Sequence, residues 1–363
     1  MTPYLETVAG ELGAQAAFLA EREPVYAHGL ALLRDALAGP FGTLLESTWN
    51  ARAFHASYER PLLLLAALRN DALLEGPGHP LHAALCADPP DADAFTAEAL
   101  AQALAPERTR FYASLRNRAV QTNETTRAVT WLWPAHLLGQ SGERRTLTLV
   151  DLGASAGLNL VADGLPASWV DGAGAAVPVA PLPPIGMRLG VDVSPIDVSN
   201  EAGAAWLRAC VWPSDRARLA RLEQAIAAYT VRAAEPGGPQ LTACGLADVW
   251  PLLEVLPRDG VVLCVQTIVR DYLAADDRAR YELAKRNFML SRPPRSVFIA
   301  ELEIDAEAGA AGAPAERSAA ITVRFREHGE REPKALVLAR THPHPRTLFV
   351  DPAAVAELSR GPR

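Results

Sequence analysis

The sequence is poor in the residues that mark disulfide-rich, zinc-binding and nucleic-acid-binding proteins. Among its 363 residues are four widely separated cysteines without a C-x-x-C pair, which argues against a disulfide framework or a cysteine zinc site. Lys285 and Lys334 are its only lysines, and its net charge is −7. Because no basic cluster stands out, we expect no nucleic-acid partner.

A secretion signal and long apolar runs are also missing. The first residues, MTPYLETVAGELG, contain Glu6 and Glu11 and lack a basic region followed by an apolar core, so no signal peptide is predicted. The longest apolar runs, such as PLLLLAAL, fall far short of the roughly 20 residues of a membrane-spanning helix. We therefore expect a cytoplasmic protein without a membrane partner, and the sequence leaves its oligomeric state open.

The hydrophobic pattern changes near residue 143. Before this point the apolar residues recur at helical spacing, which predicts an all-helical domain over 1–143 with five to seven helices. After it, apolar strand-like runs alternate with amphipathic helices. The predicted strands are 146–152, a run ending at Asp192, 239–245, 261–269 and 296–304. This alternation predicts an α/β domain over 144–363 with a mostly parallel sheet.

The C-terminal part departs from this alternation. The stretch AAITVRFREHGEREPKALVLARTHP contains two strand-like runs around a polar turn, which is typical of an antiparallel hairpin at the sheet edge. The preceding low-complexity stretch AEAGAAGAPAERS predicts a mobile surface loop. The expected fold class is therefore α/β and Rossmann-like, with a C-terminal antiparallel hairpin.

The stretch TLTLVDLGASAGLNL predicts a strand, a glycine-spaced turn and a helix. Gly153, Ser155 and Gly157 form the G-x-S-x-G pattern that presents a nucleophilic serine in α/β-hydrolases. With Asp151 before them, the same glycines form a D-x-G-x-x-x-G loop suited to an adenosyl cofactor. A third possibility is a structural turn that binds no ligand.

The serine hydrolase has partial support from the sequence. His342 or His344 follows Ser155 in the required chain order. However, a nucleophile elbow lies in the middle of a sheet, whereas the chain before this turn is helical and lacks an HGGG-type oxyanion segment. A serine hydrolase based on Ser155 therefore stays an alternative.

The adenosyl cofactor agrees better with the position of the turn. The turn follows the first strand of the sheet, where the strand order of a doubly wound fold reverses and a crevice opens. We expect Asp151 to face the ammonium group of S-adenosylmethionine, and Asp192 to bind the ribose hydroxyls. The following helix would offer N–H groups at its N-terminus. A nicotinamide or flavin is less favoured because the spacing is not G-x-G-x-x-G.

Several stretches together resemble a bacterial family known as domain of unknown function 2332. They are LVDLGASAGLNL, GVDVSPIDV, WLRACVWPSDRARLARLEQAI, QTNETTRAV and LARTHPHPRTLFV. The family is grouped with S-adenosylmethionine-dependent methyltransferases, so the resemblance implies a methyltransferase-like fold and this cofactor, but no particular reaction. Its members usually have Gly-Asp-Ala after the third strand, whereas this chain has Gly245 and Leu246 and then Asp248, which becomes the candidate adenine contact.

The remaining candidate residues lie near the expected crevice. Gln266 and Tyr272, at and after the end of the fourth strand, are candidates for acceptor-side catalytic groups. No N-P-P-Y step supports methylation of an amino group. His344, beside His342, belongs to a surface turn, an acid–base group or, less favoured, a metal site, and we predict no metal.

The other predicted cofactor-binding residues are Asn123, Arg127 and Asn159. The segment with Asn123 and Arg127 is expected as a helix that folds over the cofactor. The alternative for Asn123 is that it caps this helix. The predicted function is methyl transfer from S-adenosylmethionine to a small molecule that the helical domain selects. The alternatives are a non-catalytic protein that binds an adenosyl metabolite, and the serine hydrolase.

Overall fold

The computed structural model of the chain describes residues 1–50, 52–305 and 315–360. It divides into two compact units, Met1–Thr122 with Asp197–Arg221, and Asn123–Ile196 with Leu222–Arg363. The division therefore falls at residue 122, not near residue 143, and a segment from the second half of the chain belongs to the first unit. Most of the predicted surface loop, residues 306–314, lies outside the described residues.

The first unit is helical throughout its described part. Its helices are α1 (Pro3–Leu19), α2 (Pro24–Ala36), α3 (Pro40–Trp49), α4 (Glu59–Glu75), α5 (His82–Cys86), α6 (Ala97–Ala103), α7 (Thr109–Asn117), α9 (Glu201–Ala209) and the first part of α10 (Arg216–Ala233). Helix α4 is apolar around most of its circumference and is buried against α1, α7 and α9, as expected of a central helix. Eight α-helices, counting α8 (Val129–Gln140) of the second unit, occupy the described part of 1–143 instead of five to seven.

The second unit is built on a nine-stranded sheet of order β2-β9-β8-β7-β6-β5-β1-β3-β4. The strands are β1 (Leu147–Leu152), β2 (Val170–Asp171), β3 (Ile185–Asp192), β4 (Pro239–Ala243), β5 (Val261–Thr267), β6 (Val297–Ile304), β7 (Ala319–Phe325), β8 (Lys334–Thr341) and β9 (Thr347–Val350). The five strands β4, β3, β1, β5 and β6 are parallel to their neighbours in this group. The predicted mostly parallel sheet is confirmed.

The antiparallel hairpin formed by β7 and β8 is also confirmed, but it does not end the sheet. Strand β9 pairs with β8, and β2 pairs with β9. These two strands have four and two residues, so neither produces the long alternation by which the other strands are detected in the sequence. The prediction of a hairpin at the edge was therefore wrong.

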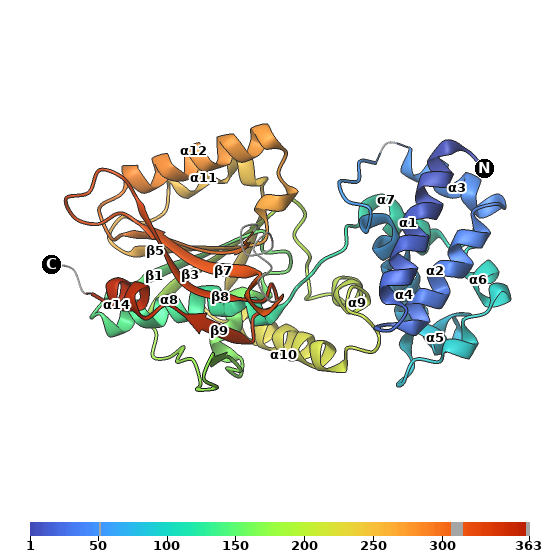
Figure 1. The fold of residues 1–363 in the computed structure, drawn as a ribbon, viewed down its shortest axis with the longest axis horizontal. Helices are drawn as coiled ribbons and strands as arrows, with labels where there is room; N and C mark the ends of the chain where they lie inside the picture. The colour runs from blue at the N-terminus through green and yellow to red at the C-terminus, as the bar shows by residue number, and fades with distance from the viewer. Residues whose placement is uncertain (51, 306–314, 361–363) are drawn as a thin grey trace. The chain divides into compact units, whose positions relative to one another are not determined.

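Helices cover both faces of the sheet in the second unit (Figure 1). One face packs against α8 (Val129–Gln140) and α14 (Pro352–Leu358), and the other against α11 (Val249–Leu253) and α12 (Ala275–Ser291). Neighbouring residues of a strand point to opposite faces, so Leu149 belongs to the first apolar cluster and Val150 to the second. We call the face that packs against α8 and α14 the α8 face, and the face that packs against α11 and α12 the α12 face.

Two segments predicted as helices are short 3₁₀ helices. The glycine turn after β1 is followed by a 3₁₀ helix, Leu158–Gly164, and Asn123 precedes the 3₁₀ helix Thr125–Ala128. Arg188 of β3 donates hydrogen bonds to the Leu160 carbonyl and to the Asp163 carboxylate, so that carbonyl has a partner outside the α-helical pattern. The helix N-terminus that was expected to face the cofactor is therefore that of a 3₁₀ helix.

None of the described helices combines the length and the apolar character needed to cross a bilayer.

Candidate cofactor site

The glycine turn lies at the point where the order of the parallel strands reverses. Strand β1 lies between β3 and β5, and Asp151 is in register with Gly190 on one side and Val265 on the other. The chain continues from β1 to β3 and β4 on one side and later to β5 and β6 on the other. Ligands of doubly wound α/β proteins bind at the carboxyl ends of the strands at such a point.

The turn, residues 153–157, has an unusual backbone conformation. Gly153, Ser155 and Gly157 all adopt positive φ values, of 81°, 53° and 71°. A Cβ atom on Gly153 would lie 2.5 Å from Cγ2 of Val269, and one on Gly157 would lie 2.8 Å from Cδ2 of Leu241. Both glycines are therefore required by the backbone angles and by close packing against the protein's own side chains.

Asp192, at the end of β3, holds the turn in place. Its Oδ2 accepts a hydrogen bond of 2.8 Å from the Ser155 amide, and its Oδ1 accepts one of 2.9 Å from the Ser194 amide. The residue is half-buried. Its carboxylate thus links the end of β3 to the glycine turn, in addition to any contact with a ligand.

Asn123 and Ser155 are brought together by the fold. The Asn123 side-chain amide donates a hydrogen bond of 2.9 Å to the Ser155 hydroxyl, and Ser155 is only 7% exposed. Asn123 does not cap the following 3₁₀ helix, because Glu124 accepts the hydrogen bond from the Thr126 amide. Asn123 therefore contacts the glycine turn directly.

Asp151 is the most unusual group at this point. It is 4% exposed, and its Oδ2 atom has no hydrogen-bond partner among the residues that the structure describes. Burial, together with the nearby negative charge of Asp192, raises the pKa of Asp151 to about 7. A buried carboxylate with this pKa is well suited to accept a hydrogen bond from a cationic ligand.

The turn that contains His342 and His344 lies beside the segment that follows Asn123. The Arg127 guanidinium donates a hydrogen bond of 3.0 Å from Nε to the Pro343 carbonyl. His344 Nδ1 lies 3.6 Å from Oε2 of Glu124, whose side chain is almost fully buried. Within the described parts of the chain, no three His, Cys, Asp or Glu side chains gather as metal ligands would.

The other predicted cofactor-binding residues are placed differently. The Asn159 carbonyl accepts a hydrogen bond of 2.9 Å from the Trp131 indole, and its side-chain Oδ1 is buried without a hydrogen bond to any described residue. Asp248 is exposed at the end of a short 3₁₀ helix after β4, the strand at one edge of the sheet. Among the described residues, no hydrogen bond or ion pair links Asp248 to the glycine turn.

The two predicted acceptor-side residues have opposite surroundings. Tyr272 is 60% exposed, whereas Gln266 is fully buried on the α12 face. The Gln266 amide donates a hydrogen bond of 2.7 Å to Glu303, and its carbonyl accepts one from the Tyr281 hydroxyl. Both ends of the Gln266 side chain are thus held by neighbouring residues.

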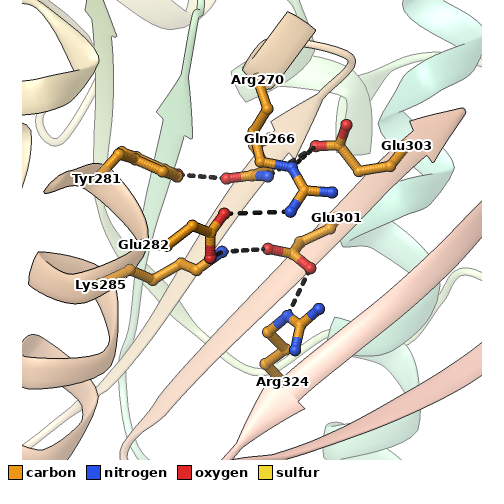
Figure 2. A network of polar contacts seen from close by, with 8 residues as sticks. All are labelled: Gln266, Arg270, Tyr281, Glu282, Lys285, Glu301, Glu303 and Arg324. Carbon is orange, nitrogen blue, oxygen red and sulfur yellow. Dashed lines mark hydrogen bonds and ion pairs between the residues drawn. The ribbon is translucent and has the colours of Figure 1, made fainter. Parts of the chain in front are cut away.

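Sequence reasoning missed the charged cluster around Gln266. Its other members are Arg270, Tyr281, Glu282, Lys285, Glu301, Glu303 and Arg324 (Figure 2). One signal was present in the sequence, because Glu301 and Glu303 interrupt the apolar strand SVFIAELEI at alternate positions. Two carboxylates on one face of a buried strand require cationic partners.

These features define a protein of the α/β class, with a mostly parallel sheet and a candidate ligand site where its strand order reverses. The chain belongs to the family described as "Uncharacterized protein conserved in bacteria (DUF2332)", which it matches over residues 11–349. The family assignment from the sequence is thus confirmed. No curated protein matches the chain.

Proposed function

We propose that the protein is an S-adenosylmethionine-dependent methyltransferase that acts on a small molecule, with its cofactor at the carboxyl end of β1. The observation that carries this proposal is the buried Asp151 carboxylate, whose Oδ2 has no hydrogen-bond partner in the described chain. Its position beside a glycine turn at the reversal of strand order supports a ligand with a cationic group.

The residues of the site fit such a cofactor. Asp151 would bind the cofactor's ammonium group, and the Asp192 carboxylate, which also holds the turn, would accept hydrogen bonds from the ribose hydroxyls. Val193 follows Asp192 and is 75% exposed, so it offers apolar surface to the adenine ring. Asp248 would have to reach the adenine amino group from the end of β4.

The bound cofactor would supply an activated methyl group. The protein would contribute mainly by positioning, because methyl transfer requires the acceptor atom in line with the methyl carbon. His344, which lies 3.6 Å from the Glu124 carboxylate, is the candidate base for the acceptor's proton. Near pH 7, a bound ammonium group would favour the ionised form of Asp151 and release a proton.

The test is isothermal titration of the folded protein with S-adenosylmethionine and with S-adenosylhomocysteine. We expect Asp151→Asn and Asp192→Ala to weaken binding at least tenfold. Asp171→Ala is the matched control, because Asp171 also accepts hydrogen bonds from two backbone amides, those of Ala173 and Ala175. Titrations in buffers of different ionisation enthalpy should show proton release in the wild type and none in Asp151→Asn.

The same titration separates this proposal from a ligand-free turn. If the folded wild type binds neither compound, or if Asp171→Ala weakens binding as much as Asp192→Ala does, the proposed cofactor site is wrong.

The non-catalytic binding protein is the second candidate. The enclosed position of Gln266 favours it, since this predicted catalytic side chain is bonded at both ends to other protein groups. The two candidates differ in turnover of S-adenosylmethionine in the presence of acceptors, and not in binding. The hydrolase has less support because the Ser155 hydroxyl is buried and bonded to Asn123, and we expect a fluorophosphonate probe to leave Ser155 unlabelled.

A further inference from the structure

The loop between β5 and α12, residues 268–274, packs directly on the glycine turn. Val269 occupies the space beside Gly153, because a Cβ atom there would lie 2.5 Å from the valine Cγ2. The preceding residue, Ile268, has a φ of 56°, which is rare and costly for a β-branched side chain. A backbone held in this conformation needs other contacts that compensate for its cost.

Arg270 supplies such contacts from within the loop. Its Nη1 forms a hydrogen bond of 3.1 Å with Oε1 of Glu282 on α12, and its Nε lies 3.0 Å from Oε1 of Glu303 on β6 (Figure 2). The Arg270 side chain is 16% exposed. Since a guanidinium has donors in a rigid planar arrangement, it can contact a helix and a strand at once.

The two carboxylates that Arg270 contacts belong to the larger cluster of Figure 2. Glu282 also lies 2.6 Å from Lys285 Nζ, which in turn lies 2.8 Å from Glu301. Arg324 of β7 donates a hydrogen bond of 2.7 Å to the other oxygen of Glu301. The cluster thus contains three cations, Arg270, Lys285 and Arg324, and three carboxylates, Glu282, Glu301 and Glu303.

The electrostatics of the cluster favour a permanent contact. Burial raises the pKa of Glu303, and the positive charge of Arg270 opposes this shift. Burial alone would lower the pKa of Arg270, but Glu303 and Glu301 raise it above its ordinary value. Arg270 therefore stays positively charged throughout the accessible pH range.

We propose that Arg270 is a positioning residue that holds the β5–α12 loop, through Val269, against the glycine turn, so that the charged cluster on the α12 face stabilises the candidate ligand site. The contact with the turn follows from the fold alone. The effect on ligand affinity rests on the proposed function of this site.

Hydrogen–deuterium exchange of the full chain without ligand tests the first part. We expect Arg270→Gln to accelerate exchange at least tenfold in residues 268–274 and also at the Gly153 and Ser155 amides, which are hydrogen-bonded to Val191 and Asp192. Arg286→Gln is the matched control, because this arginine of α12 pairs with Glu332 at the surface, and it should change neither segment. Faster exchange in the loop with an unchanged glycine turn would overturn the proposal.

Two further variants keep the test decisive if Arg270→Gln fails to fold. Val269→Ala removes the contact with Gly153 without changing any charge, and it should accelerate exchange at the turn. Arg270→Lys keeps the charge but cannot reproduce the two-sided contact, so we expect it to restore only part of the protection. Full protection of the turn in both variants would overturn the proposal.

Titration with S-adenosylhomocysteine tests the second part. We expect Arg270→Gln and Val269→Ala to weaken its binding at least fivefold, whereas Arg286→Gln binds like the wild type. Unchanged affinity in both loop variants would overturn the link between the cluster and the site. If the wild type does not bind, the proposed function fails, and the exchange experiment still decides whether Arg270 positions the turn.

Discussion

Two polar clusters lie at the carboxyl ends of the parallel strands, on opposite faces of the same sheet. On the α12 face, three carboxylates form ion pairs with three cations (Figure 2). On the α8 face, the carboxylates of Asp151 and Asp192 are near each other, and within the described residues no ion pair reaches either of them. The first cluster is balanced in charge, and the second is not.

The difference indicates different roles for the two clusters. A balanced buried network fixes the arrangement of the elements that carry it, here α12, β6, β7 and the β5–α12 loop. An unbalanced pair of carboxylates costs stability that a bound cation can restore, and such groups concentrate at functional sites. This contrast is the reason why we propose a ligand site at Asp151 and a positioning role for Arg270.

The largest expected loss of stability comes from breaking the balance on the α12 face. The Glu301 side chain is 2% exposed and contacts both Lys285 and Arg324. Removing one partner of a buried ion pair leaves an uncompensated charge, so we expect Glu301→Gln to lower the free energy of unfolding by about 3 kcal/mol. Urea denaturation measures the effect. Glu332→Gln, which removes a surface partner of Arg286, should cause no measurable change.

The charge on the α8 face should appear in the pH dependence of stability. The pKa of Asp151 is raised to about 7 in the folded protein, whereas the pKa of an aspartate in the unfolded chain is about 4. The contribution of Asp151 to the free energy of unfolding is therefore most favourable below pH 4, and it is lost as the pH rises to about 7. We therefore expect Asp151→Asn to gain stability over the ligand-free wild type by about 1.4 kcal/mol per pH unit between pH 4 and 7.

Denaturation of both proteins at pH 4.5, 6 and 8 measures this difference. Asp171→Asn is the control, because Asp171 is half-buried and accepts two backbone hydrogen bonds. If the free energies of unfolding of the wild type and Asp151→Asn change in parallel with pH, the raised pKa of Asp151 is contradicted.

The smallest expected effect concerns the contact between Asn123 and the glycine turn. Asn123→Ala removes one hydrogen bond of 2.9 Å, so we expect a loss of about 1 kcal/mol. If the bond to Ser155 is the cause, Asn123→Ala in a Ser155→Ala background should cost much less. A double-mutant cycle measured by urea denaturation gives this coupling, and a coupling of zero would remove Asn123 from the site.

Much of the sheet could be predicted from the sequence because its strands produce strong local patterns. Strand β1 is fully buried and β5 nearly so, and both therefore read as apolar runs. The helix expected after the glycine turn is present as a 3₁₀ helix and not as an α-helix, since Gly157 adopts a left-handed conformation and Arg188, from a distant strand, binds the Leu160 carbonyl. No local pattern contains that contact.

In the candidate site, too, the features with a local sequence pattern were predicted and the contacts between distant residues were not. Asp151, the two glycines and Asp192 were found because their spacing follows the ends of the first two strands of the parallel sheet. The role of Arg270 was not found, because its partners Glu282 and Glu303 lie on a helix and a strand whose packing the sequence alone does not give.

The sequence by itself determined the family, the alternation that produces a mostly parallel sheet, and the glycine turn with its acidic neighbours. These features depend on the chemistry of residues close together in the chain. The tertiary structure decided which charges are compensated. It gave Glu301 two cationic partners and left Asp151 buried next to a second carboxylate. Burial and distance between residues far apart in the chain set these energies, and both exist only once the sheet has formed.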